Sequence, residues 1–343
     1  MNITIKEVAL KAGVSQSTVS LVLNNKQSIK KSTREKVLQV INELDYHPQR
    51  SARNLASQRT GNIGFIISDE HFTRAEPFYT RIFLGSEFEA RHLDYYLLLT
   101  SVSKNFSRKE LPRFLKEGNI DGIIAAGSMN DKWLYEMAGM KIPIVLIDYF
   151  PPRLKWSCVL IDNAEGGRDA VNYLLALGHE KIGFIGGSFT HPSIKERHRG
   201  FTLALEEAGV NHNPEWVITD ETETRVIDGY YATKKLLAAK DRPTALFAAN
   251  DAMATGALKA AREAGLEIPD DISVIGFDNI DVTKYTNPPL TTMNVRMEEM
   301  GAFAIKMIFD RIYQKKSVQE KILVPVDLVT RESCRRLSPA PQR

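Results

Sequence analysis

Hydrophobic and polar positions in the first fifty residues repeat with the period of an α-helix. Apolar side chains form one stripe in residues 4–12, a second in residues 15–23 and a third in residues 32–44. The spacing therefore predicts three short helices, packed as a small bundle. The second helix keeps a face of short polar side chains turned away from the bundle core.

Capping residues mark where these helices begin and end. Thr4 and Glu7 have the spacing of a capping box. Gly13 supplies a left-handed residue that ends the first helix, and Ser15 caps the second. The run Ser-Thr-Arg-Glu at residues 32–35 predicts a second capping box. A buried helix, a glycine turn and an outward polar helix are typical of a helix-turn-helix, whose second helix enters the major groove of DNA. An ordinary helical hairpin is the alternative for these residues alone.

The short segment after the bundle has a different character. Pro48 stands at a first helical position and predicts a helix over about residues 49–57. Isolated helices below ~12–15 residues are marginal in water, so this helix needs a packing partner. Ala52 would let a second copy of the chain approach closely, and Leu55 has no evident core to enter. In DNA-bending proteins such a leucine is a wedge between base steps. A plain linker with Leu55 on the body surface is the alternative.

From residue 61 the pattern changes to apolar strands that alternate with amphipathic helices. This order predicts parallel sheets with helices on both faces. About 280 residues are long for one sheet, so two similar subdomains are expected. The expected strands cover residues 63–68, 95–100, 122–126, 144–148, 159–162, 182–186, 217–219, 245–249 and 273–277, with a closing strand at 322–328. The expected helices cover residues 77–92, 107–117, 130–139, 163–177, 195–208, 226–238, 251–264 and 294–315.

The fold class predicted from these patterns is a small all-α helix-turn-helix head plus an α/β core of two doubly wound parallel-sheet subdomains. Ligands in such folds bind at the carboxyl ends of the strands, so the cleft between two facing sheets is the expected site.

The charge is distributed unevenly along the 343 residues. Residues 1–60 contain ten Lys and Arg against four Asp and Glu, whereas the remainder contains 35 against 38. A basic head on a mildly acidic body indicates that the head meets a polyanion.

Other classes of protein are disfavoured by what the sequence lacks. No apolar run approaches the ~20 residues of a membrane span, and the N-terminus has no secretory signal. Cys158 and Cys334 make no disulfide framework. We therefore expect a cytoplasmic protein with no membrane partner.

Enzymes and secreted binding proteins are the two further alternatives. Residues 182–187 place glycines after a strand, but no G-x-G-x-x-G follows, which disfavours a Rossmann-type oxidoreductase. There is no P-loop, metal-ligand cluster or nucleophile elbow either, so no catalytic residue, metal or cofactor is expected. A secreted sugar-binding protein would explain the core but not the basic head.

Ten short motifs follow one another along the chain. They are TIKEVA (residues 4–9), AGVS (12–15), TVS (18–20), STREKV (32–37), LAS (55–57), ALGH (176–179), RHRGF (197–201), ANDAM (249–253), GFDN (276–279) and PLTT (289–292). In this order they resemble the lactose/galactose-repressor family of bacterial transcription regulators. The resemblance implies a DNA-binding head, a hinge helix and a core like the type I periplasmic sugar-binding proteins. It also implies a repressor of carbohydrate-utilisation genes, switched by a sugar-like effector in the cleft.

The resemblance further implies a homodimer on a near-palindromic double-stranded operator. The chain ends without the leucine heptads of a tetramer, which favours the dimer. The expected organisation is a head at residues 1–47, a hinge helix and linker at 48–60, a first core subdomain at 61–162 plus about 291–321, a second at 163–290 plus about 322–334, and a loose tail at 335–343.

Candidate DNA contacts follow from the matched positions. Base reading is assigned to Gln16, Ser17 and Leu21, and minor-groove contact by the hinge to Ala52, Arg53 and Leu55. Phosphate contact is expected from polar residues that have helix capping as their alternative role, and these are Thr4, Ser15, Thr18, Ser20 and Asn24.

Candidate effector contacts also follow from the matched positions. They are Phe78, Tyr79, Asp148, Arg197, Asn250 and Asp278. One Arg, two Asp and an Asn suit a polyhydroxylated ligand, because carboxylates and amides can each bind paired hydroxyls while aromatics cover the apolar face of a sugar.

Each of these assignments has a purely structural alternative. For the two Asp it is capping, for the two aromatics it is core packing, and for Arg197 it is a surface ion pair. Trp216 is a possible stacking platform, but Thr224 lies nearer to the family's aromatic position.

Leu21 departs from the family's pattern, in which an arginine at this place reads a guanine. Leucine cannot donate to the guanine acceptors of the major groove, although it can contact a thymine methyl. We therefore predict a weak guanine preference at that operator position; the alternative is that Leu21 packs partly against the head's own core. Selection of binding sites from a library of random half-sites measures this preference, and an invariant guanine would contradict the prediction.

Overall fold

The computed structural model describes residues 3–23, 28–46, 59–72, 77–151, 156–221, 223–314 and 318–337. The chain divides into two compact units, Met1–Gly61 and Asn62–Arg343. The expected hinge helix at residues 49–57 lies outside the described residues, as do all but three residues of the expected tail.

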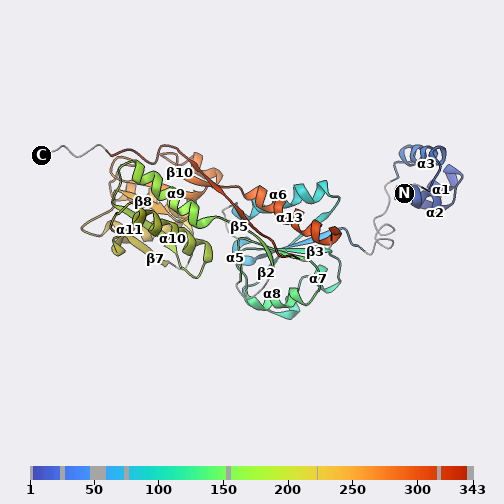
Figure 1. Cartoon of the computed structure of the whole chain (residues 1–343), viewed down its shortest axis with the longest axis horizontal. Helices are drawn as coiled ribbons and strands as arrows, with labels where there is room; N and C mark the ends of the chain where they lie inside the picture. Colours follow the sequence, from blue (N-terminus) through green and yellow to red (C-terminus); the bar gives the residue numbers. More distant parts are fainter. Residues whose placement is uncertain are drawn as a thin grey trace. The chain divides into compact units, whose positions relative to one another are not determined.

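The described part of the first unit is a bundle of α1 (Ile5–Ala12), α2 (Gln16–Leu23) and α3 (Lys31–Glu43) (Figure 1). Thr4 and Glu7 form the expected capping box, in which the Thr4 N–H donates to Glu7 Oε2 at 2.6 Å. Gly13 ends α1 with a φ of 64°. The core of the bundle consists of apolar side chains from all three helices and Tyr46, namely Val8, Ala9, Ala12, Val19, Val22, Val37, Val40 and Tyr46.

The second expected capping box is wrong. The helix α3 begins at Lys31, before Ser32, and its N-cap residue Lys30 makes no side-chain hydrogen bond to the helix. The Ser-to-Glu spacing matches the motif, but Ser32 lies inside the first turn, where its hydroxyl cannot act as the cap. Leu23, the last residue of α2, is half-buried.

Two six-stranded sheets form the framework of the second unit. The first has the order β11-β5-β4-β3-β1-β2, and its strands are β1 (Asn62–Ser68), β2 (Tyr96–Val102), β3 (Gly122–Ala126), β4 (Ile144–Ile147), β5 (Ser157–Ile161) and β11 (Lys321–Val324). The second has the order β12-β10-β9-β8-β6-β7, and its strands are β6 (Ile182–Gly187), β7 (Val217–Glu221), β8 (Ala245–Ala248), β9 (Ser273–Asp278), β10 (Thr291–Val295) and β12 (Val326–Val329). The described pairs are parallel except β10 with β12.

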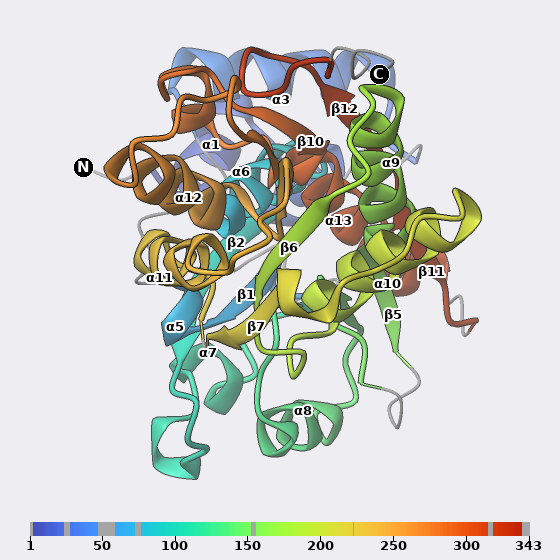
Figure 2. The ribbon, with the colours of Figure 1, turned by 90° about the vertical axis from the view of Figure 1, so that its left-hand side faces the viewer.

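Helices cover both faces of each sheet. In the first subdomain α6 (Phe78–His92) and α13 (Met297–Gln314) pack on one face, and α7 (Arg113–Lys116) and α8 (Asp131–Ala138) on the other. In the second, α9 (Asn163–Ala176) and α10 (Pro192–Glu207) lie opposite α11 (Val226–Leu237) and α12 (Asp251–Glu263), on either side of β6 (Figure 2). Shorter turns are α5 (Asp69–Phe72), η1 (Arg108–Glu110), η2 (Pro214–Trp216) and η3 (Asp281–Lys284). The two doubly wound subdomains predicted from the sequence are therefore present.

The chain crosses between the subdomains at three single residues. Asp162 separates β5 from α9, Arg296 separates β10 from α13, and Pro325 separates β11 from β12. The Arg296 guanidinium is held by Asp327 beside the third crossing, with Nε to Oδ2 at 3.0 Å. Each subdomain is consequently built from segments that are distant in the sequence.

Some expected elements differ from the structure. The strand β10 was not expected and belongs to the second sheet, so the second crossing lies after the expected boundary near residue 291. The expected closing strand at 322–328 is two strands, one in each sheet, because Pro325 interrupts the run. The expected helix at 107–117 is a short 3-10 turn and a short helix, because Pro112 interrupts it. None of the described helices is long and apolar enough to cross a membrane.

Glycines let three helix pairs approach at backbone distance. The pairs α6–α13, α9–α10 and α11–α12 each place one glycine from either helix against the other. A Cβ on any of these glycines would lie 2.0–2.3 Å from a backbone oxygen of the partner helix. The six residues are Gly85, Gly301, Gly167, Gly200, Gly229 and Gly256. A side chain at these positions therefore forces the helices apart.

We expect Gly301→Ala to destabilise the first subdomain, because its Cβ would lie 2.1 Å from Ile82 O. Overpacking of this kind costs about 1–3 kcal/mol. The melting temperature should fall by about 2–4 °C for each kcal/mol. The matched control is Gly139→Ala, where the nearest atom would be Glu136 O at 3.3 Å. Equal melting temperatures of the two variants, measured by differential scanning calorimetry, would show that the helix spacing is not fixed by this glycine.

Candidate functional site

The outward face of α2 carries the residues expected to read DNA bases. Gln16 and Ser17 are exposed at the start of this helix. Leu21 is 38% exposed and is not part of the head's apolar core. This position argues against the alternative in which Leu21 packs into the head.

The expected phosphate-contacting residues also have structural roles. Thr4 belongs to the capping box of α1. Ser15 Oγ accepts from the Thr18 N–H at 3.1 Å and lies 2.7 Å from Ser17 Oγ. Ser20 is half-buried. Capping leaves further hydrogen-bonding capacity, because a hydroxyl has two lone pairs and a proton. The remaining expected DNA contacts, Asn24, Ala52, Arg53 and Leu55, lie outside the described residues.

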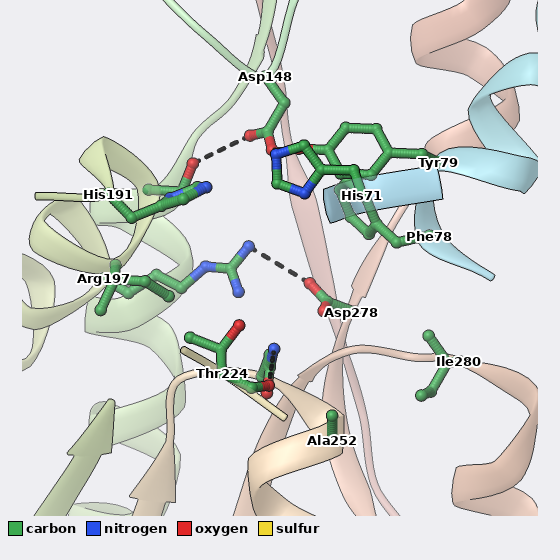
Figure 3. A pocket seen from close by; sticks show the side chains of 13 residues that line it. His71, Phe78, Tyr79, Asp148, His191, Arg197, Thr224, Ala252, Asp278 and Ile280 are labelled. Atoms are coloured by element: carbon green, nitrogen blue, oxygen red, sulfur yellow. Dashed lines mark hydrogen bonds and ion pairs between the residues drawn. The ribbon is translucent and has the colours of Figure 1, made fainter. Parts of the chain in front are cut away.

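A pocket of about 660 Å³, part of it open to solvent, lies between the two core subdomains (Figure 3). The structure brings all six expected effector residues to its lining: Phe78, Tyr79, Asp148, Arg197, Asn250 and Asp278. Sequence reasoning assigned no effector contact to the other lining residues, which are His71, His191, Ser193, Ile194, Thr224, Ala252 and Ile280. We refer to this space as the inner compartment.

Arg197 is the buried cation of the inner compartment. It lies on α10, and its side chain is 5% exposed. Its Nε donates to Asn163 Oδ1 at 2.8 Å and its Nη1 to Ala249 O at 2.6 Å. Its Nη2 lies 3.3 Å from Asp278 Oδ1, toward which it points in Figure 3. Since the guanidinium also lies 3.7 Å from the Phe277 ring centroid, it is fixed from several sides. A surface ion pair does not describe this residue.

Asp148 connects the two subdomains. It follows β4 with a φ of 56° and is buried. Its Oδ2 accepts from the Tyr79 hydroxyl of the first subdomain at 2.9 Å, and its Oδ1 accepts from the Ser193 hydroxyl of the second at 2.9 Å. Both hydrogen bonds join Asp148 to side chains that line the pocket, whereas a residue that caps a turn bonds to backbone N–H groups.

Asp278 ends β9 with an unusual backbone, a φ of 113°. The adjacent turn is held by Asp251, a fully buried carboxyl whose Oδ2 accepts from the Ile280 N–H at 2.9 Å. Burial raises the pKa of Asp251 well above its usual range, and the nearby Asp278 carboxylate raises it further. Asp251 therefore positions the turn that carries Asp278.

Asn250 combines a structural role with its place in the pocket. Its Oδ1 accepts from the Met253 N–H at 2.8 Å and caps α12. Its Nδ2 donates to Thr224 O at 3.0 Å, which ties the loop after β7 to the end of β8. Trp216 is not a stacking platform here, since it is buried and its Nε1 donates to Asp241 O at 2.8 Å.

Aromatic rings cover one wall of the inner compartment. Phe78 and Tyr79 lie edge to face with their centroids 5.0 Å apart, and His71 lies 4.6 Å from Tyr79. Gly127, with a φ of 77°, makes room for them. A Cβ there would lie 2.6 Å from His71 Cδ2 and 2.8 Å from the Tyr79 hydroxyl.

The inner compartment has the charged, polar and aromatic groups of a small-molecule binding site. Two carboxylates, one guanidinium and an amide come from both subdomains, next to an aromatic wall. No group of three or more His, Cys, Asp or Glu within the described ranges has an arrangement that could hold a metal ion.

Some of the missed residues had a signal in the sequence. Ser193 stands four residues before Arg197, and therefore on the same side of a helix, but the helix was expected to start at residue 195 and begins at Pro192. His71 and Thr224 follow strands by a few residues, as ligand-binding side chains in such folds do.

A helix-turn-helix head joined to two sheets with a ligand-sized cleft between them defines a ligand-responsive DNA-binding regulator. Two family descriptions match the chain. Residues 4–49 match "Bacterial regulatory proteins, lacI family", and residues 171–334 match "Periplasmic binding protein-like domain". The transcriptional repressor PurR of Pasteurella multocida is 36% identical over 333 residues, which are 96% of this chain and 98% of the relative. The chain belongs to the lacI family of bacterial transcriptional repressors.

Solved structures agree with this membership. A transcriptional regulator CelR–cellobiose complex is similar with a TM-score of 0.72 and 31% identity, over 96% of this chain and 99% of that chain. The lac repressor dimer bound to operator and the anti-inducer ONPF is similar with a TM-score of 0.80 and 26% identity, over 98% of this chain and 100% of that chain. The protein is thus a DNA-binding repressor with an effector-binding core.

We expect Arg197→Lys to destabilise the core, because a lysine cannot reach Asn163, Ala249 and Asp278 together. Removal of one partner from a buried ion pair costs about 3–5 kcal/mol, which is an upper bound here because lysine keeps the charge. Arg199→Lys is the matched control, since Arg199 forms an exposed pair with Glu196 and surface changes stay within about 0.5 kcal/mol. Equal melting temperatures of the two variants would contradict the role given to Arg197.

Proposed function

We propose that this protein is a homodimeric repressor of carbohydrate-utilisation genes, controlled by a neutral sugar or sugar derivative in the inner compartment. The observation that carries the proposal is the set of buried polar groups on Asp148, Arg197 and Asp278, which come from both subdomains. Carboxylates and a guanidinium in fixed positions suit the adjacent hydroxyls of a sugar, and Phe78 and Tyr79 suit its apolar face. The relative that binds cellobiose supports the same class of ligand.

A purine base is the second candidate, because the repressor PurR is among the relatives. A flat base is bound best between two apolar or aromatic faces. In the described lining Phe78, Tyr79 and His71 lie on the side of α5 and α6, the ring from the second subdomain is the imidazole of His191, and Thr224 occupies the position at which an aromatic was considered. The two carboxylates also favour a ligand with many hydroxyl donors. These features support a sugar over a purine.

Control of DNA binding follows from the two-part architecture. The helix predicted from the sequence at residues 49–57 would be too short to be stable in isolation, so its formation would depend on the operator and on the core. An effector that contacts both subdomains changes the angle between them, and with it the geometry offered to this segment. Moving a two-state population from 1:99 to 99:1 requires about 5.5 kcal/mol of differential binding. A dimer has two clefts, so each bound ligand needs to supply only part of this free energy. The ligand can favour either of the two states.

The dimer is supported by apolar side chains left on the surface of the first subdomain. Leu84 and Phe88 stand one turn apart on α6 and are exposed, as are Tyr96 and Leu99 on the edge strand β2. An exposed apolar surface of this kind is typical of an interface between subunits. The similar lac repressor is a dimer on its operator.

Operator binding in the presence of candidate ligands tests the proposal. We expect at least one sugar, and no purine base, to change the operator Kd at least tenfold, measured by fluorescence anisotropy on an operator obtained by site selection. Asp148→Asn should lose the response, measured as the ratio of the operator Kd without and with the sugar, because an amide cannot accept from both Tyr79 and Ser193 and also serve sugar hydroxyls.

The control for this experiment is Asp94→Asn. Asp94 is exposed and has a φ of 59°, close to that of Asp148. Both variants therefore replace an aspartate by an asparagine at a residue with a left-handed backbone conformation. A response to adenine, guanine or hypoxanthine instead of sugars would support the second candidate. A response that survives in Asp148→Asn would contradict the assigned site.

A further inference from the structure

A second, larger compartment adjoins the inner one. It has about 1060 Å³ of empty space, part of it open, and shares His71, His191 and Thr224 with the inner compartment. The two spaces are therefore one continuous cleft. We refer to the second space as the outer compartment.

The position of the outer compartment follows from the strand order. The inner compartment lies at the carboxyl ends of β4, β8 and β9, whereas the outer one lies at the carboxyl ends of β1, β2 and β3 in one sheet and of β6 and β7 in the other. In the strand orders β2 and β7 are edge strands, so the cleft extends from the middle of each sheet to its edge. Both subdomains contribute to the outer compartment.

Hydroxyl and amide groups dominate the outer lining. They belong to Ser68, Ser103, Ser128, Asn130, Ser188, Thr190 and Thr224. Local hydrogen bonds fix several of them before any ligand arrives. Asn130 Oδ1 caps α8 by accepting from the Lys132 N–H at 2.9 Å, which leaves its amide group as a donor. Ser188 Oγ accepts from the Thr190 N–H at 3.2 Å. Pre-ordered polar groups lower the cost of binding.

The charges of the outer lining disfavour an anionic ligand group. Its described acids and bases are Glu70, Glu223, Lys104 and the imidazoles of His71 and His191, and Lys104 Nζ is engaged 3.2 Å from Glu70 Oε1. The inner compartment likewise has two carboxylates against one guanidinium. The two carboxylates in each place disfavour a phosphate or carboxylate, whereas a neutral hydroxylated unit finds donors and acceptors in both.

We infer that the effector is a neutral saccharide of two linked units, with one ring in the inner compartment against Phe78 and Tyr79 and the second in the outer compartment among the hydroxyl and amide groups. This inference rests on the proposed sugar control and specifies its ligand class. The second unit contacts the loops after β3 and β6, and so adds contacts between the subdomains to those made around Asp148. The effector thereby favours one angle between the subdomains more strongly than a single ring does.

Calorimetric titration of the full-length protein with matched sugars tests the inference. The probes are glucose, galactose, cellobiose, maltose, lactose and melibiose, with glucose 1-phosphate as the anionic probe. At least one disaccharide should bind at least tenfold more tightly than either of its monosaccharides, and glucose 1-phosphate more weakly than glucose. If monosaccharides bind and no disaccharide binds more tightly, the inference is overturned while the sugar assignment stands.

Two variants locate the second unit. Thr190→Trp fills the outer compartment from an exposed loop position and should weaken disaccharide binding at least tenfold, with monosaccharide binding changed less than twofold. Asn130→Ser keeps a helix-capping side chain but removes the amide donor, and should weaken only the disaccharide, about threefold to tenfold. Asn213→Ser is the matched control, since Asn213 caps η2 outside both compartments and should leave both affinities unchanged.

The remaining outcomes are also decisive. A disaccharide that binds tightly to wild type and equally tightly to Thr190→Trp and Asn130→Ser would place its second unit elsewhere and overturn the inference. Binding of none of these sugars, with purine bases bound instead, would contradict the proposed sugar control and this inference together.

Discussion

A buried positive charge is the constraint on which the effector-binding core depends. The Arg197 side chain is only 5% exposed, so its donors depend on partners within the protein, and an unmatched guanidinium there would be costly. Its partners are the amide oxygen of Asn163, the carbonyl of Ala249 and the carboxylate of Asp278. These partners lie at the start of α9 and at the ends of β8 and β9, so one side chain fixes the relative position of three chain segments.

The same arrangement explains why the cleft is suited to ligand control. Asp148 reaches the Ser193 hydroxyl across the cleft, while Asp278 remains tied to Arg197 within the second subdomain. One bridging contact is easily exchanged for contacts with a ligand, whereas the ion pair keeps its own subdomain rigid. The glycines at the α6–α13, α9–α10 and α11–α12 contacts have a similar effect. They bring paired helices of the same subdomain to backbone contact, so each subdomain is packed more tightly than the cleft between the two.

The helical spacing of apolar residues was enough to predict the head, and the alternation of apolar strands and helices was enough to predict the two-sheet core, because parallel strands buried on both faces are strongly apolar. The pattern did not reveal β10, whose sequence includes two threonines and an asparagine, and it merged β11 with β12 because valines flank Pro325. Asp148, Asn250 and Asp278 were placed by resemblance at the ends of recognisable strands, and the other three effector residues on crossover segments. His191 and Ser193 were missed because their helix begins earlier than its apolar period indicates. Asp251 was missed because its role depends on a turn that only the fold brings to it.

The three crossings between the sheets govern the order in which the newly made chain can become structured. The helix α6 lacks its partner α13 until the ribosome has passed residue 314, and the first sheet lacks its edge strand β11 until the ribosome has passed residue 324. The second sheet waits even longer for β12. The N-terminal head contains its whole core within its first 46 residues and can fold as soon as it leaves the exit tunnel. A nascent repressor is therefore a finished DNA-binding head followed by nearly 300 residues whose two sheets close only in the last moments of translation.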